Sequence, residues 1–465
     1  MERRYILFDT PARDLLYPFT HTRPVAAIRV GILTIREKWE RWLNASTSFL
    51  TLPYLQEKFP LQTIHAEDQC VLINGHILPD HKLVAAVQAL ETGQELYWEG
   101  VLVAKVVVAG SLKLPESGGR GLPVAGDADY SGGDAHVGGS GYSGGNSWEG
   151  AAGPAINDSM GDIAEQAHGD SLVGGSVYSG GDSSALTVHH TAVVQRLNYQ
   201  ESVQQLTYPW DIFRLNDSAL RQDFSLLTEG RTSAPISGSN QVNGAENIFL
   251  EPGAVVEHSI LNGKTGPIYI AKGAEVMEGC LIRGPLALCE GAVLKMGTKI
   301  YGATTLGPGS VGGGEIKNVV MLGYSNKGHD GYLGDAVLGE WCNLGGNTTN
   351  SNLKNNAGTV RVWVEARNEA IPAGTKCGLI MGDYSRSGIG TMFNTGTVIG
   401  VSCNIFGGEF PPKFVPSFSW GGVHPEPYRE QEALRDARQW MQFKGQQLGD
   451  VEERLLKAVY AKVKS

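Results

Sequence analysis

The stretch that decides the fold runs from residue 270 to residue 309 and reads IAKGAEVMEGCLIRGPLALCEGAVLKMGTKIYGATTLGPG. Every sixth residue of this stretch is aliphatic, without a gap: Ile270, Val276, Ile282, Leu288, Leu294, Ile300 and Leu306. Leu250 and Val256 precede the run at the same interval. This period is neither the 3.6 residues of an α-helix nor the two-residue alternation of a single long strand.

Glycine accompanies the repeat. It commonly stands three residues after the aliphatic position, at residues 253, 273, 279, 291, 297 and 309. This spacing is typical of a coil in which each short strand buries one side chain and a glycine turns the corner. The register resumes further on, at Leu338, Leu344, Phe393, Ile399 and Ile405. A glycine-rich loop does not explain that register, so we predict a hexapeptide-repeat parallel β-solenoid over residues 245–410.

Composition and charge narrow the function classes. The 465 residues suggest about three domains. With 38 basic and 48 acidic side chains the chain carries a net charge of −10, which argues against nucleic acid as a partner. It contains no run of apolar residues long enough to span a membrane, and its first residues lack the apolar stretch of a signal peptide. Its six cysteines form no CxxC pair, as expected of free thiols in a reducing compartment. We therefore expect a cytoplasmic protein that is not inserted into a membrane.

The residues before the coil predict an α/β domain formed by 1–110 and 186–235. Apolar runs at 5–8, 71–75 and 101–109 are typical of strands, and apolar residues at helical spacing fall in 32–43 and 81–91. After residue 186, the stretches 208–213 and 219–228 predict a turn and a helix that lead out of this domain.

Two further segments differ in composition. Residues 111–185 are rich in glycine and serine, have few large aliphatic residues, and repeat Tyr-Ser-Gly-Gly from positions 130, 142 and 178. Such a segment buries too little apolar surface to offset its ordering entropy, so we expect a disordered insertion, with a metal or carbohydrate role as the alternative. Residues 411–465 predict an extended, proline- and aromatic-rich segment followed by two amphipathic helices that break near 445–449.

Within the coil, residues 314–352 read GEIKNVVMLGYSNKGHDGYLGDAVLGEWCNLGGNTTNSN. The run combines Glu-x-Lys at 315–317, Gly-His at 328–329, Tyr-Leu-Gly-Asp-Ala at 332–336, and asparagines at 343 and 352. In these motifs it resembles the acetyltransferase half of the bacterial bifunctional N-acetylglucosamine-1-phosphate uridyltransferase/glucosamine-1-phosphate acetyltransferase family. The resemblance implies a left-handed β-helix that forms a homotrimer and binds acetyl-CoA between neighbouring coils.

The resemblance also implies a role for each motif residue. His329 corresponds to the general base, because a neutral imidazole takes the amine proton as nitrogen attacks the thioester. Lys317 suits an anionic sugar phosphate. Tyr332 and Asn343 are expected to hydrogen-bond sugar hydroxyls, and Asn352 to orient the amine or the acetyl group. The family places a basic residue one turn earlier, where this chain has Lys299.

Each of these residues also has a plainer interpretation. His329 in a loop and Lys299 on a surface need no function, and asparagines such as Asn343 and Asn352 stabilise turns. A zinc-dependent carbonic anhydrase, which the same coil supports, needs three convergent histidines. Only His258 and His329 occur between residues 245 and 420, so no metal site is expected in the coil.

The N-terminal half resembles sugar-1-phosphate nucleotidyltransferases. That family opens with a strand, a Gly-rich loop ending in Gly-Thr-Arg, a Pro/Thr segment and a lysine, and it uses Mg²⁺ in phosphoryl transfer. Here Arg13 and Arg23 are the candidate nucleotide-binding residues, within the stretch FDTPARDLLYPFTHTRPV at 8–25. The Gly-rich loop is missing, and no lysine precedes Lys38.

Together these features predict acetyl transfer from acetyl-CoA to the amine of glucosamine 1-phosphate or a related amino-sugar phosphate, in UDP-N-acetylglucosamine-type nucleotide-sugar synthesis. Uridylyl or thymidylyl transfer by the N-terminal half, with Mg²⁺, is the second expected activity. One alternative is a nucleotidyltransferase whose coil serves only oligomerisation or regulation. The other is a non-catalytic scaffold that does not bind acetyl-CoA.

Overall fold

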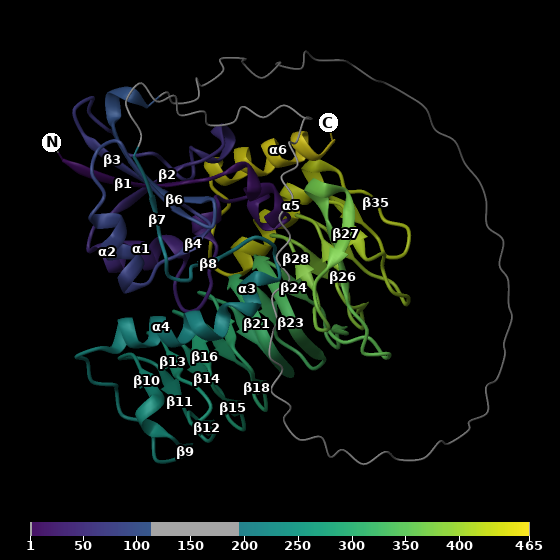
Figure 1. The fold of residues 1–465 in the computed structure, drawn as a ribbon. Helices are drawn as coiled ribbons and strands as arrows, with labels where there is room; N and C mark the ends of the chain where they lie inside the picture. The colour runs from purple at the N-terminus through teal and green to yellow at the C-terminus, as the bar shows by residue number, and fades with distance from the viewer. Residues whose placement is uncertain (1, 113–194, 465) are drawn as a thin grey trace, which may run out of the picture. The chain divides into compact units, whose positions relative to one another are not determined.

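A computed structural model describes residues 2–112 and 195–464. These residues fall within one compact unit (Figure 1). The expected disordered insertion at 111–185 lies outside the described residues from position 113 onward. No helix of the described residues is long and apolar enough to cross a membrane.

The N-terminal half is built on a six-stranded sheet in the order β2-β1-β3-β6-β5-β7. Its strands are β1 (Arg3–Phe8), β2 (Thr47–Leu50), β3 (Gln69–Asn74), β5 (Gln94–Trp98), β6 (Val101–Val108) and β7 (Gln195–Asn198). Strands β1, β2 and β3 are parallel, whereas β6 runs antiparallel to β3. Strand β7 follows the insertion in the sequence and pairs with β5, so segments on both sides of the insertion contribute to this sheet.

Helices and short turns complete this half. Helix α1 (Ile35–Leu43) begins with a capping box between Thr34 and Glu37 and buries Trp39 completely. The other helices are α2 (His81–Gln88), α3 (Asp211–Arg214) and α4 (Asn216–Thr228), and a short ladder joins β4 (Ile77–Leu78) to β8 (Gln204–Gln205). Three 3₁₀ turns follow β1, at η1 (Pro11–Leu16), η2 (Phe19–His21) and η3 (Val25–Ala27).

The C-terminal half is a coil of short parallel strands, seen as successive rungs in Figure 1. One face carries β10 (Ile248–Leu250), β13 (Ile268–Ile270), β16 (Leu286–Leu288), β19 (Thr304–Leu306), β28 (Ile380–Met381), β31 (Val398–Ile399) and β33 (Phe414–Val415). A second carries β11 (Val255–Val256), β14 (Glu275–Val276), β17 (Val293–Leu294), β20 (Val311–Gly312), β22 (Asn326–Lys327), β24 (Asn343–Leu344), β29 (Arg386–Ser387), β32 (Asn404–Ile405) and β34 (Ser419–Trp420). A third carries β9 (Gln241–Asn243), β12 (Ile260–Asn262), β15 (Leu281–Arg283) and β18 (Lys299–Tyr301). The long strands β21 (Glu315–Gly323) and β23 (Tyr332–Glu340) span the first and third faces.

The six-residue period forms the core of this coil. All the aliphatic positions of the repeat, from Leu250 to Ile405, are buried together in one apolar cluster. Ile270 lies in register with Leu288, and Leu288 with Leu306, so every third position of the repeat returns to the same face. The predicted parallel β-solenoid is confirmed.

The bounds of the coil differ from the predicted 245–410. It begins at β9, before residue 245, and continues through β33 and β34, where the sequence predicted only an extended segment. An antiparallel hairpin, β26 (Arg361–Val364) and β27 (Glu369–Pro372), interrupts it with a 3₁₀ turn, η7 (Glu365–Arg367), at its tip. The hairpin and the last strands, β33 and β34, lack the six-residue spacing, which is why the sequence did not reveal them. Helices α5 (Glu430–Phe443) and α6 (Asp450–Lys464) close the chain.

Candidate functional site

The ladder of β18, β21 and β23 brings together residues that are distant in the sequence. Lys299 pairs with Glu315, and Glu315 pairs with Tyr332. In the same ladder Tyr301 pairs with Lys317. Because alternate residues of a strand point to the same side, these five side chains lie on the outer side of the third face. Three of the predicted site residues, Lys299, Lys317 and Tyr332, thus share one surface.

Tyr301 and Glu315 join Lys317 in this surface. The Tyr301 hydroxyl donates to Glu315 Oε1 over 2.5 Å, and burial together with this carboxylate raises the pKa of Tyr301 to about 12. The Lys317 ammonium lies 5.9 Å from the centre of the Tyr301 ring, within cation–π range. Among the described residues the Lys317 ammonium forms no ion pair, so its charge is available to an anion.

Tyr332 and Asn352 are held by a buried carboxylate. Asn352 Nδ2 donates to the Tyr332 hydroxyl over 3.1 Å and also to the Asp335 carboxylate. Asn318 Nδ2 donates to the other Asp335 oxygen over 2.7 Å. Burial, followed by the nearby Asp335 charge, raises the pKa of Tyr332 well above its ordinary value. The Tyr332 hydroxyl therefore keeps its proton and, having accepted from Asn352, can donate it to a ligand oxygen.

His329 lies in the loop that connects β22 to β23, three residues before Tyr332. Its side chain is exposed, and within the described part of the chain its imidazole makes no hydrogen bond or ion pair. The ring lies over Gly346, where an added Cβ would be 3.9 Å from His329 Cγ and 4.0 Å from Cγ2 of the exposed Ile389. The imidazole thus faces solvent with both ring nitrogens unbonded within the described residues, at the corner next to the Tyr332 surface.

Asn343 is placed differently from the other predicted residues. It lies on β24, on the second face, and its Oδ1 accepts from Asn326 Nδ2 over 3.3 Å. The structure brings Lys299, Lys317, Tyr332 and Asn352 to one surface, sets His329 at its corner, and leaves Asn343 on the neighbouring face.

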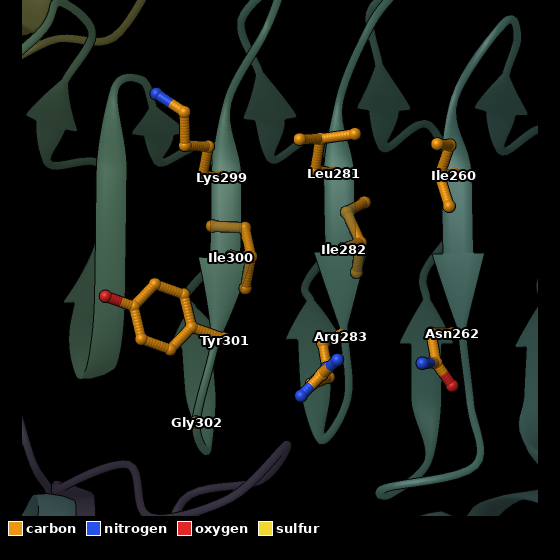
Figure 2. Close-up of a pocket in the computed structure, with 9 residues that line it drawn as sticks. All are labelled: Ile260, Asn262, Leu281, Ile282, Arg283, Lys299, Ile300, Tyr301 and Gly302. Atoms are coloured by element: carbon orange, nitrogen blue, oxygen red, sulfur yellow. The ribbon is translucent and has the colours of Figure 1, made fainter. Parts of the chain in front are cut away.

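A groove of about 460 Å³ runs along the third face from the Lys299 and Tyr301 end of this surface. Figure 2 shows Lys299, Leu281 and Ile260 in one row and Tyr301, Arg283 and Asn262 in the other. Two of its apolar side chains face solvent, Leu281 at 47% and Ile260 at 41% exposure. Within the described residues the guanidinium of Arg283 forms no ion pair. The groove therefore combines apolar walls with two free cations, Arg283 and Lys299.

The sequence did not single out Tyr301, Glu315, Asp335 and Arg283. Glu315 and Asp335 belong to the quoted motifs, which was the available signal for them. Tyr301 and Arg283 fall outside the motifs, and their positions follow only from the strand register.

The two predicted nucleotide-binding residues are buried. Arg13 donates through Nε to Asp9 over 3.2 Å and through a second nitrogen to Asp14 over 3.0 Å. Arg23 donates to Glu340 over 2.9 Å and also to Asp383, and both of those carboxylates belong to the coil. Burial acts to lower the pKa of each arginine, but these carboxylates outweigh it and raise the pKa. Nucleotide binding by these arginines stays a prediction, one that this packing disfavours because their charges are already paired.

The residues near Arg13 do not suit the expected Mg²⁺. The Asp9 carboxylate already accepts from the Val25 backbone N–H over 2.9 Å and the Thr51 hydroxyl over 2.6 Å, as well as from Arg13. Residues 2–112 and 195–464 contain no group of three or more side chains of the kinds that hold a metal ion. We therefore derive no step through a metal.

Comparisons with known proteins agree with this two-part architecture. Residues 5–122 and 157–232 match the family described as sugar nucleotidyl transferase. The bifunctional protein GlmU of Methanocaldococcus jannaschii is 33% identical over 89 residues, which cover 19% of this chain and 21% of that protein. The bifunctional protein GlmU of Methanococcus maripaludis is 28% identical over 193 residues, covering 42% of this chain and 40% of that protein. The chain thus spans less than half the length of these curated relatives.

Among solved structures, an Arabidopsis UDP-N-acetylglucosamine acyltransferase is similar over 43% of this chain and 76% of its own, at 14% identity and a TM-score of 0.24. That likeness carries no argument about activity. The chain is therefore similar to sugar nucleotidyl transferases over residues 5–122 and 157–232, and to bifunctional GlmU proteins over part of its length.

Proposed function

We propose that the coil transfers the acetyl group of acetyl-CoA to the amine of an amino-sugar 1-phosphate of the glucosamine 1-phosphate kind. One observation carries this proposal: a solvent-facing imidazole, His329, with no internal hydrogen bond, lies one loop away from the surface formed by Lys299, Lys317, Tyr332 and Asn352.

The chemistry needs few groups. The amine nitrogen of the sugar attacks the thioester carbonyl, the new C–N bond forms, and the C–S bond breaks to release the coenzyme A thiolate. His329 takes the proton that the nitrogen loses and returns it to the thiolate. Holding the two substrates at this corner supplies the orientation that the bimolecular reaction lacks in water.

Acceptor recognition follows from the charges on the outer side of the third face. Lys317 and Lys299 have no ion-pair partner among the described residues and suit a phosphate dianion. The Tyr332 hydroxyl donates to a sugar oxygen, because burial raises its pKa and keeps it protonated while it accepts from Asn352. Asn343 faces away within one chain, and we propose that a homotrimer uses it at the contact between neighbouring coils.

The test compares two matched histidines. His329→Asn removes the proposed base, and His258→Asn changes the other exposed coil histidine, whose φ of 50° asparagine tolerates. Thioester consumption is measured with acetyl-CoA and glucosamine 1-phosphate. We expect kcat to fall about a hundredfold or more in His329→Asn and to stay unchanged in His258→Asn. Equal turnover in both variants would exclude His329 as the base, and no turnover in the unaltered protein would exclude this acceptor.

A second candidate activity is nucleotidyl transfer to a sugar 1-phosphate, which the family match over residues 5–122 and 157–232 favours. Pyrophosphate release with UTP or dTTP and a sugar 1-phosphate tests it. Substituting Arg13 or Arg23 is not a clean test because both are buried in ion pairs. His329→Asn is the better variant: loss of thioester turnover with pyrophosphate release retained would establish two independent activities.

A further inference from the structure

A charged residue occupies the core of the coil directly beneath His329. Lys327 is the inward-facing residue of β22, where it lies in register with Gly312 of β20. Most other inward positions of this column are aliphatic, as at Val276, Leu294 and Leu344, and the exceptions, Gly312 and Ser387, are uncharged. The Lys327 side chain is nevertheless almost fully buried, at 1% exposure.

The Lys327 ammonium is satisfied by backbone oxygens. It donates to the carbonyls of Gly313 over 3.1 Å, His329 over 2.5 Å and Asp330 over 3.3 Å. An ammonium has three N–H donors, so these three acceptors use all of them. In the described part of the chain this lysine forms no ion pair with a carboxylate.

The loop that carries His329 depends on this contact. Among the described residues, Lys327 is the one hydrogen-bond donor recorded for the carbonyls of His329 and Asp330. Removing it leaves these two carbonyls to water and loosens the peptide units on either side of the imidazole. A buried ammonium without a counter-charge is unfavourable, and an apolar residue would suit the coil better.

We propose that Lys327 is a positioning residue, whose ammonium holds the His329 and Asp330 carbonyls of the 328–330 loop against the Gly313 carbonyl and thereby fixes where the His329 imidazole stands. This inference rests on the proposed acetyl transfer. It differs from a purely structural role because it assigns Lys327 a cost in stability and a gain in turnover.

One test uses chemical rescue. Lys327→Ala removes Cγ, Cδ, Cε and Nζ, which together correspond to n-propylammonium, and n-propanol is the neutral match. We expect kcat for thioester turnover to fall about tenfold to a hundredfold with the KM for acetyl-CoA nearly unchanged, because a small misplacement of a reacting group has an effect of this size. Added n-propylammonium restores kcat several-fold and n-propanol does not. Equal rescue by the alcohol, or wild-type kcat in the folded variant, would overturn the proposal.

A matched lysine provides the control. Lys444 is also partly buried, and its ammonium donates to a coil carbonyl, that of Gly309, over 2.8 Å. Lys444 lies outside the proposed site, so Lys444→Ala is expected to leave kcat unchanged and to show no response to n-propylammonium. A rescue of equal size in Lys444→Ala would show that the amine acts nonspecifically.

Lys327→Met covers the case in which the alanine variant fails to fold. Methionine fills the aliphatic column without a charge, so the thermal midpoint is expected to hold or rise while kcat falls. If the thermal midpoint and kcat both fell, the lysine would be merely structural and the proposal would be overturned.

Amide hydrogen exchange of residues 328–331 in Lys327→Met separates this inference from the acetyltransferase itself. Faster exchange there supports the clamp even if no acceptor turns over, and unchanged exchange refutes it even if the protein is an active acetyltransferase.

Discussion

The amide of Asn352 has one orientation available, because the Tyr332 hydroxyl and the Asp335 carboxylate both accept from its Nδ2. Its oxygen is thereby turned away from both of these groups. The Asp335 carboxylate thus orients the Asn352 amide, and it needs no contact with a substrate to do so.

Asp335→Asn tests that arrangement. Asp335 has a φ of 45°, which asparagine also tolerates, so the backbone is not strained by the change. The new amide donates where the carboxylate accepted, and we expect a loss of stability of about 1–3 kcal/mol and a fall in kcat/KM for the acceptor. Urea denaturation and acceptor kinetics measure these effects. Asn318→Gly is the control: it removes one donor to Asp335, tolerates the φ of 53° at this position, leaves Asn352 in place, and should change kcat/KM much less. Equal losses in the two variants would contradict the orienting role of Asp335.

Titration of Lys327 gives a second residue-scale prediction. Burial lowers the pKa of Lys327 to about 8, and the charge of Asp330, in the same loop, only partly offsets it. The strands on either side, β20 and β24, add no titratable side chain. As pH rises through about 8 the amine loses one of its three donors, so kcat should fall, and this alkaline limb should be missing in Lys327→Met.

The free energy of unfolding should rise with pH over the range in which kcat falls. Between about 8 and the ordinary lysine value the unfolded chain binds more protons than the folded one, so the free energy of unfolding contributed by this group rises with pH. Turnover and thermal midpoint are measured on the same samples from pH 7 to pH 9.5. A stability contribution from Lys327, taken as the difference from Lys327→Met, that falls over this range would contradict the assignment.

Strand β18 links the core of the coil to the outer surface within three residues. Ile300 points inward at 1% exposure, between Lys299 and Tyr301 on the outside. Ile300→Ala is expected to cost about 2–5 kcal/mol of unfolding free energy, because the surrounding strands cannot close the cavity. Leu281→Ala on the adjacent strand β15, exposed on the outer side, is the matched control and should change stability by less than about 0.5 kcal/mol. Chemical denaturation measures both, and similar losses would mean that the third face is not laid out as described.

The strands of the coil were predictable because each aliphatic side chain of the repeat packs on the equivalent side chains of the adjacent coil turns. A repeat in the sequence is therefore enough to indicate them. The hairpin β26–β27 and the strands β33 and β34 were not, because β26 and β27 pair with each other and the last coils lack the six-residue spacing. The site residues divide in the same way, into those that a sequence motif indicates and those that only the fold shows. Lys299, Lys317 and Tyr332 were named from the resemblance, whereas Tyr301 and Arg283 lie outside the motifs and required the strand register.

At the scale of the whole molecule, the segment after β1 packs on the coil. The Thr22 hydroxyl donates to Asp383 over 2.6 Å, Arg23 pairs with Asp383 and Glu340, and the His21 ring lies 3.2 Å from a Glu365 oxygen. Sequence alone placed Arg23 in a nucleotide site because its motif resembles one. It contained no sign that two carboxylates, more than three hundred residues later, lie opposite this guanidinium.

Arg23→Met tests this junction. Removing the cation leaves the buried Asp383 and the partly buried Glu340 without their partner, and breaking a buried pair such as Arg23–Asp383 costs about 3–5 kcal/mol of unfolding free energy. Arg221→Met is the control, because its pair with Asp217 on helix α4 is half exposed and contributes about 0.5 kcal/mol or less. Guanidinium chloride unfolding measures both variants. A loss in Arg23→Met no larger than in Arg221→Met would show that the junction does not hold the halves together.

The junction also bears on how such a chain is inherited. Two halves that meet through apolar surface alone can be exchanged between related genes and still associate. Here, a recombination event that replaced the first half with one lacking the arginine would leave a buried and a partly buried carboxylate without a cation. A coil that lacked the two carboxylates would instead leave the arginine buried without a counter-charge. Each half therefore constrains which sequences the other can accept, and successful chimeras of this lineage should carry Arg23, Glu340 and Asp383 together.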